Sequence, residues 1–356
     1  DLGWKMIFTI RTVYKDSFCN ILLKDIAYDE FRVESIADEV LEAISEQYHF
    51  PLPQNQNLRS LLKDFFYLKL YLKLDPAGLD LVSSEELFLQ QVWKEVICDS
   101  HRRAENLPVR REEMVTHIVF SMLQRGSTIY ISSANDDYMA LTALEDSGII
   151  AVYDNSPRRW MMSHDVYEEL IIKHILTQRY QEGIEAEKVL EGFGLSLRAR
   201  KLYRIWLESV FASGGGRYAD FLISMLQSGL DQAWKDETLI ALMQSDQVDC
   251  FRAIDPILSQ ERYSLFTRMV FLLNTACRDI DRELLKKLST PTGNKYRFTC
   301  PVGRAWFTVF QYIYNNRGLI PWTAQNLDIV TNTLKTWTAK YETGETTGLA
   351  GIALYI

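Results

Sequence analysis

The chain has 356 residues, 47% of them hydrophobic and 24% charged, so it can form two or three domains with apolar cores. Its net charge of -8 argues against a general nucleic-acid binder. The sequence contains no apolar run of about 18 residues, so it indicates no membrane-spanning segment. The five cysteines form no Cys-x-x-Cys pair, which argues against a zinc or dithiol site and favours a reducing cytoplasm.

The first predicted element is a buried strand at residues 5–11, which delivers Thr9 and Arg11 at its carboxyl end. Ligands of α/β proteins bind at such strand ends. An ordinary strand with a solvated arginine is the alternative. The sequence contains no Gly-x-x-x-x-Gly-Lys-Ser/Thr loop, so we expect no ATP hydrolysis and assign no catalytic residue. Because the chain begins with Asp1 rather than methionine, we expect it to be part of a longer protein.

Three helices are predicted next. Apolar residues recur at helical spacing from residue 30 to 47, and Pro51 and Pro53 should stop that helix. A second helix is expected at residues 58–70, where Phe65 would be part of the core. The third is expected at residues 85–101, with Leu87 on its buried side.

The central part is predicted to contain helices at residues 111–123 and 137–147, and a hairpin of strands at 149–153 and 160–162. Another helix follows, for which Ser163 or Asp165 can act as N-cap. His164 then lies at the first turn, where helix N–H groups can meet an anion, although a structural role is the alternative. The order of elements predicts a winged-helix domain.

The remaining sequence is predicted to be helical. After a glycine-containing joint, a helix at residues 195–207 carries a basic stripe, which we interpret as a solvated or interdomain face. Its members are Arg198, Arg200, Lys201 and Arg204. Further helices are expected at residues 217–227, 231–244, 248–258, 263–277, 282–288, 306–315 and 323–341. Their spacing suggests stacked helical pairs of a solenoid.

The Met-Ser-His-Asp sequence at residues 162–165 resembles the Met-His-Asp motif of STAND NTPases, the class that includes NLR immune receptors. This resemblance implies that His164 touches the β-phosphate of bound ADP and keeps the protein closed. The Thr-x-Arg end of the first strand is similar to the family's sensor, which implies that Arg11 senses the γ-phosphate and Thr9 supports it. The helix at 58–70 resembles the family's lid, with Phe65 in the place of a proline that packs on adenine.

The resemblance implies a mainly α fold with four parts. These are the end of an α/β NTPase core (1–25), a helical lid (26–106), a winged-helix domain (107–180) and a solenoid-like helical domain (181–356). It also implies an ATP/ADP-controlled switch of bacterial antiviral defence, with Mg²⁺ held by an upstream core. The implied partners are further copies of the chain and a phage or other protein trigger.

Two other functions remain open. One is a DNA-binding winged-helix transcription regulator, in which Arg110, Arg111 and Arg125 would contact DNA. The other is an α-helical adaptor without nucleotide chemistry.

Overall fold

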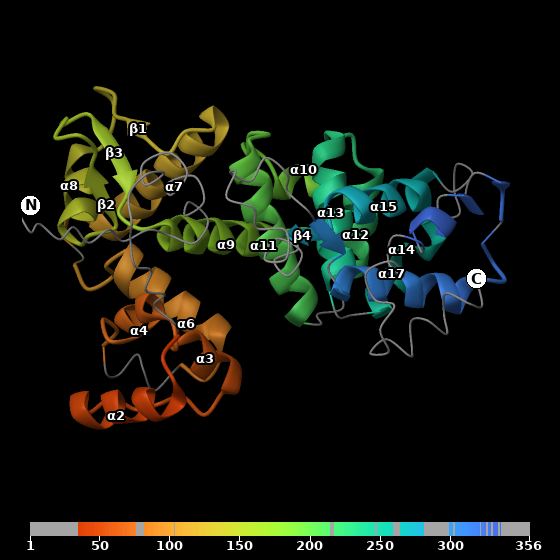
Figure 1. Ribbon diagram of the computed structural model, residues 1–356. Helices are drawn as coiled ribbons and strands as arrows, with labels where there is room; N and C mark the ends of the chain where they lie inside the picture. The colour runs from red at the N-terminus through yellow and green to blue at the C-terminus, as the bar shows by residue number, and fades with distance from the viewer. Residues whose placement is uncertain are drawn as a thin grey trace, which may run out of the picture. The chain divides into compact units, whose positions relative to one another are not determined.

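The computed structural model describes residues 35–75, 82–102, 104–213, 217–245, 248–258, 264–280, 299–301 and 303–320, and some positions between 322 and 335. The fold is mainly α, as predicted, with small antiparallel sheets (Figure 1). The strand with Thr9 and Arg11, the helix predicted at residues 282–288 and most of the helix predicted at 323–341 lie outside the described residues. The chain divides after Leu72 into two compact units.

The first unit begins with α2 (Asp38–Tyr48). The helix was predicted from residue 30, but the chain at Ile36 and Ala37 precedes the helix, and the Ile36 N–H donates to the Lys63 carbonyl at 2.8 Å. The helix ends before the two prolines, as predicted. Its C-cap His49 takes a left-handed conformation with φ 55°.

The single helix predicted at residues 58–70 is wrong, because two short helices, α3 (Gln56–Leu61) and α4 (Phe65–Tyr71), occupy this stretch. The Asp64 side chain accepts the Phe66 N–H at 2.7 Å and so caps a new helix start inside the predicted one. Asn55 caps α3 in the same way.

The second unit contains α6 (Glu85–Val92), which continues as a π-helical turn, η1 (Trp93–Ile97). The predicted lid, residues 26–106, includes α6 and η1 together with the helices of the first unit. In place of the single helix predicted at residues 85–101, the structure has α6 and η1. Leu87 is 40% exposed, against the prediction, and Phe88 provides buried surface instead.

The three-stranded sheet belongs to the central part of the second unit. After η2 (Ala104–Asn106), this part consists of α7 (Leu107–Arg125), β1 (Tyr130–Ile131), α8 (Tyr138–Asp146), β2 (Ile150–Val152), β3 (Arg159–Met162) and α9 (Asp165–Glu182). The predicted helices, hairpin and following helix are therefore present. The sheet order is β1-β3-β2, with antiparallel pairing throughout, and β1 was not predicted. Asp154 and Asn155 make the hairpin turn with positive φ.

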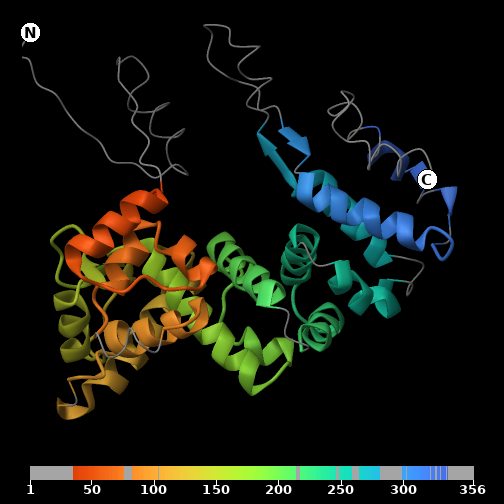
Figure 2. The same cartoon turned by 90° about the horizontal axis from the view of Figure 1, so that it is seen from below.

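Helices continue along the rest of the second unit and follow one another from green to blue in Figure 2. They are α10 (Ala186–Val189), α11 (Leu197–Ser213), α12 (Tyr218–Gln227), α13 (Gln232–Gln244), α14 (Val248–Leu258), α15 (Ser264–Thr275) and α17 (Gly303–Asn316). The strands β4 (Arg278–Ile280) and β5 (Thr299–Pro301) pair antiparallel. Buried Trp206, Trp234 and Trp306 fill the core. In the part of the chain that the structure describes, no helix combines the length and apolarity needed to cross a bilayer.

The predicted basic stripe faces neighbouring helices. Arg198 of α11 pairs with Glu168 of α9. Arg200 and Arg204 lie 3.9 and 3.4 Å from the carboxylate of Glu237 on α13. These arginines therefore hold helices together, which leaves Lys201 as the exposed member of the stripe.

Candidate functional site

The candidate site is the corner at which β3 leads into α9. Ser163 fixes this corner, because its N–H donates to the Ile149 carbonyl at 3.0 Å and its hydroxyl donates to the Gly148 carbonyl at 2.5 Å. Neither Ser163 nor Asp165 is the N-cap of α9, contrary to the prediction. The cap is the predicted site residue itself, His164.

His164 occupies the helix start with its own groups. The Val166 N–H donates to the imidazole Nδ1 at 3.3 Å, and the Tyr167 N–H donates to the His164 carbonyl at 3.1 Å. The predicted row of N–H groups available to an anion is therefore partly used within the corner. The imidazole is 39% exposed and the neighbouring Asp165 side chain is 49% exposed, so both groups are accessible at the helix start.

The protonation state of His164 decides whether Nδ1 accepts a hydrogen bond from Val166 or donates one to Asp165. An Nδ1 that accepts the Val166 N–H carries a lone pair, and the ring proton is then on Nε2. The Asp165 carboxylate oxygen lies 3.1 Å from the same Nδ1, and can accept a hydrogen bond when that nitrogen is protonated. A neutral ring thus caps the helix, whereas a protonated ring pairs with Asp165 instead.

Two further carboxylates follow in the first turns of α9. Glu168 is buried, and its pKa is raised by burial, an effect that Arg198 opposes. The pKa of Glu169 is also raised by burial, with Lys173 and Lys201 acting in the opposite direction. Acidic groups at a helix start compete with a bound anion for the positive end of the helix dipole. The corner alone is therefore a weak anion site.

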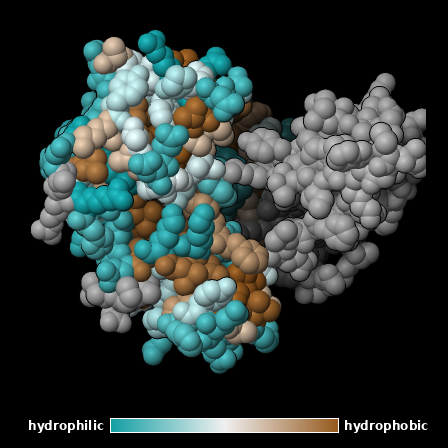
Figure 3. Space-filling view, turned by 90° about the vertical axis from the view of Figure 1, so that its left-hand side faces the viewer, coloured by the Kyte–Doolittle hydropathy of each residue, from teal (hydrophilic) through white to brown (hydrophobic). Residues whose placement is uncertain are grey.

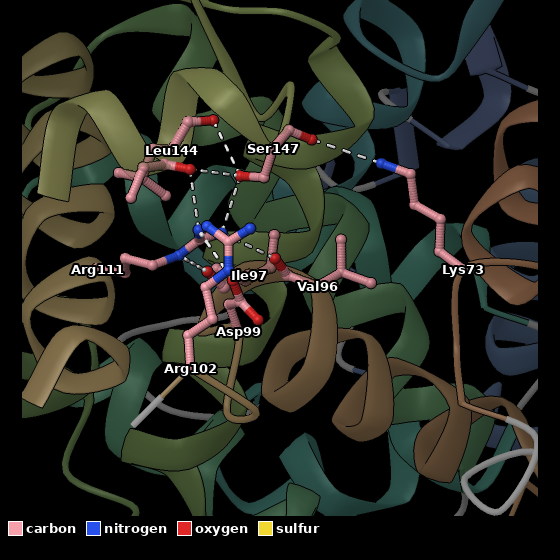
Figure 4. A network of polar contacts seen from close by, with 9 residues as sticks. Lys73, Val96, Ile97, Asp99, Arg102, Arg111, Leu144 and Ser147 are labelled. Atoms are coloured by element: carbon pink, nitrogen blue, oxygen red, sulfur yellow. Dashed lines mark hydrogen bonds and ion pairs between the residues drawn. The ribbon is translucent and has the colours of Figure 1, made fainter. Parts of the chain in front are cut away.

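A fully buried arginine, Arg111, joins η1 to α7 and α8 (Figure 4). The Arg111 guanidinium donates to the carbonyls of Ile97, Ala143 and Val96 at 2.9, 2.9 and 3.0 Å, and to the Ser147 hydroxyl at 2.9 Å. These carbonyls lie at the C-terminal ends of η1 and α8, where a cation is favourable. The residue pattern alone gave no sign of this role.

The neighbouring Arg110 is also engaged. Its Nε and Nη2 donate to the two oxygens of Asp137 at 2.5 and 2.6 Å. Asp137 in turn caps α8. Two of the three arginines that a DNA-binding function would use are therefore held in intramolecular contacts, and Arg125 at the end of α7 is exposed.

Of the other predicted site residues, Phe65 is the one that the structure describes. Phe65 is the first residue of α4, is 57% exposed and belongs to the first compact unit, whereas His164 belongs to the second. Thr9 and Arg11 lie outside the described residues. Among the residues that are described, no cluster of histidine, cysteine, aspartate and glutamate side chains could hold a metal ion.

A stacked aromatic pair between η1 and α9 was missed by sequence reasoning. The His174 ring of α9 lies on the Trp93 indole of η1, with centroids 3.8 Å apart and planes inclined by 10°. Burial lowers the pKa of His174 to about 4. A sequence signal exists in retrospect, since His174 stands among the apolar residues of an amphipathic helix, but its partner lies far away in the chain.

Comparison with known proteins identifies no relative: neither the protein-family models nor the curated proteins searched match this chain.

Proposed function

We propose that this chain is the regulatory and scaffold part of a STAND-class nucleotide switch, and that the α7–α9 region is its winged-helix domain. The proposal rests mainly on the position of His164, which stands directly after the hairpin as the N-cap of a long helix. In this arrangement, Nε2–H of a neutral imidazole donates to the β-phosphate of ADP. The sheet order β1-β3-β2 and the preceding helices support the winged-helix assignment.

In this proposal the histidine adds one contact to a phosphate site whose other residues lie in another segment of the protein. The sequence has no phosphate-binding loop, so another segment of the protein supplies the loop and the Mg²⁺ ligands. A hydrogen bond from His164 to a charged phosphate contributes roughly 1–3 kcal/mol to the closed state. ATP-dependent release of that contact would open the protein for homo-oligomerisation. The proposed setting is cytoplasmic antiviral defence, with a phage or other protein as trigger.

The test compares His164→Ala with wild type in the intact protein. We expect the variant to retain ADP less well and to form oligomers without the trigger, because a ligand shifts a two-state equilibrium only through contacts that differ between the states. Retained ADP is measured after desalting, and oligomers are measured by mass photometry. His101→Ala, a change at an exposed histidine, is the matched control. Wild-type ADP retention together with no basal oligomers in His164→Ala would reject the proposal.

The alternative of DNA binding has less support. In DNA-binding winged helices the helix before the hairpin enters the major groove. In this chain that helix is α8, whose exposed positions Tyr138, Met139, Thr142, Glu145 and Asp146 include no cation. Acidic side chains at the groove would repel phosphates. The adaptor function needs no nucleotide contact and would be favoured if His164→Ala changed nothing.

A further inference from the structure

The three-stranded sheet has one buried face and one open face. Side chains of successive residues in a strand point to opposite faces. The buried face carries residues that are at most 5% exposed, which are Tyr130, Ile150, Trp160 and Met162. The residues that alternate with them share the open face, and none of them is buried: Ile131, Ala151, Tyr153, Arg159 and Met161.

Arg159 stands in the middle of a row across the open face. On one side it pairs with Ile131 of β1, which is 52% exposed. On the other side its carbonyl accepts the Tyr153 N–H at 2.7 Å, and Tyr153 is 37% exposed. Side chains paired in this way are direct neighbours. Because Met161 and Ala151 form the next row, Arg159 is the charged member of an otherwise apolar set of five residues.

The Arg159 guanidinium has no acidic partner in the part of the chain that the structure describes. Asp154 forms the hairpin turn with φ 55° and makes no ion pair there either. Asp136 accepts the hydroxyl of Tyr130, which belongs to the buried face. A cation among apolar side chains is complementary to a carboxylate that has apolar neighbours. The open face therefore predicts a ligand that combines an acidic group with apolar groups.

The backbone of β1 adds a second feature, because β1 is an edge strand of the sheet order β1-β3-β2. Hydrogen-bonded and non-bonded residue pairs alternate along an antiparallel ladder. The Ser132 N–H donates to the Arg158 carbonyl at 2.9 Å, so the next pair, Ile131 with Arg159, is a non-bonded one. The N–H and C=O of Ile131 thus point away from β3, where an extended peptide can pair with them.

These two features favour a peptide over other occupants. If two copies packed their open faces together, Arg159 would meet Arg159, and like charges repel. Nucleic acid is bound by several cations along a surface, whereas this face offers one, in a chain of net charge -8. In an added strand, the residue opposite Ile131 places its side chain on the open face, two strand spacings or roughly 10 Å from the Arg159 backbone. A glutamate and an arginine side chain together span that distance.

We propose that the open sheet face binds an extended segment of a partner protein, in which an aspartate or glutamate is flanked by apolar residues. The segment pairs with the backbone of Ile131 and its carboxylate with Arg159. The inference does not depend on the proposed switch function. From the side on which Figure 1 places α8, the upper part of Figure 3 shows small hydrophobic areas among hydrophilic ones. Small mixed areas suit a short segment that binds reversibly.

Selection of multivalent phage-displayed random dodecapeptides on the 356-residue chain, without nucleotide, tests the proposal. We expect the selected peptides to share an acidic residue between apolar ones. A fluorescein-labelled selected peptide should bind the wild type in fluorescence anisotropy, and Arg159→Glu should weaken binding at least about tenfold, because like charges would meet. Lys94→Glu, an equal charge change at an exposed position of η1, is the control and should bind like wild type.

Two further measurements separate the carboxylate contact from the backbone contact. A peptide with lysine in place of its acidic residue should prefer Arg159→Glu over wild type, which a misfolded variant would not show. Ile131→Pro removes the outward N–H and should weaken binding, whereas Ile131→Val keeps it and should not.

The proposal is overturned if no selected peptide has the expected pattern, if wild type and Arg159→Glu bind peptide equally, if the lysine peptide shows no preference, or if Ile131→Pro binds like Ile131→Val. Two other results would assign the face to a different occupant and would also overturn it. One is binding of mixed-sequence single-stranded DNA that Arg159→Glu abolishes. The other is self-association in sedimentation velocity that the same variant abolishes.

Discussion

Replacing Arg111 with methionine is expected to loosen the contact between η1, α7 and α8. Methionine keeps most of the buried aliphatic stem but removes every donor. The Ala143 carbonyl still receives the Ser147 hydroxyl at 2.9 Å, whereas the Val96 and Ile97 carbonyls lose the hydrogen bonds described above. A buried carbonyl left without its donor costs about 1–3 kcal/mol, so the two together cost about 2–6 kcal/mol. Removing a buried charge offsets part of that cost, which gives a net loss of about 3 kcal/mol.

Native-state hydrogen exchange measured by mass spectrometry localises the loss. A local change of about 3 kcal/mol corresponds to a roughly hundredfold fall in protection, which we expect in peptides from η1 and α7. Arg110→Met, which removes the adjacent and partly exposed arginine, is the matched control and should leave η1 unchanged. Protection in η1 that falls by less than about fivefold in Arg111→Met would refute the reasoning, because the carbonyls would then be satisfied by other groups.

The remaining predictions concern three other positions. Burial lowers the pKa of His174 from 6.5 to about 4, so the unfolded chain binds a proton first as the pH falls. The free energy of unfolding should therefore drop by roughly 3 kcal/mol between about pH 6.5 and 4, and urea titrations of His174→Gln should lack that drop. Gly194→Ala should lower the melting temperature, because its Cβ would lie 2.6 Å from the Gln124 Cα; Gly183→Ala, with open space around it, should not. In the intact protein, Arg11→Ala should weaken binding of ATP but not of ADP in calorimetry, because a guanidinium can pair with the γ-phosphate; equal losses would exclude a γ-phosphate sensor.

Helices that are specified by local signals were predictable from sequence. The helix at residues 248–258 matches the prediction, and α8 follows the aspartate that caps it. The break at Asp64 shows the limit of periodicity. Apolar spacing continues across this residue, but a short carboxylate can also cap a new helix, and the competition between the two is decided by packing.

Contacts between distant segments were not predictable. Arg111 looks like an ordinary helix-surface arginine in the sequence, because its acceptors are backbone carbonyls that no residue type reveals. The basic stripe was predicted to be a solvated or interdomain face, and the pairing of its arginines with acidic side chains of α9 and α13 was not foreseen. The same limit applies to His164, whose place at the corner was predicted while its capping of the helix was not.

The free energies of the contacts around His164 limit how much of the structure a change at this residue can move. Loss of the imidazole cap costs about 1 kcal/mol, because one N–H of the first turn loses its partner. One turn later Glu168 is buried against Arg198 of α11, and separating a buried ion pair costs about 3–5 kcal/mol. A change in the ring can therefore unwind the first turn of α9 but is too weak to pull the helix away from α11. If His164 controls opening, the helical region from α9 onward should move with the corner as one body. Because Arg111 holds η1 to α7 and Trp93 of η1 stacks on His174 of α9, that body should include η1 and α6, and the moving joint should lie before α6.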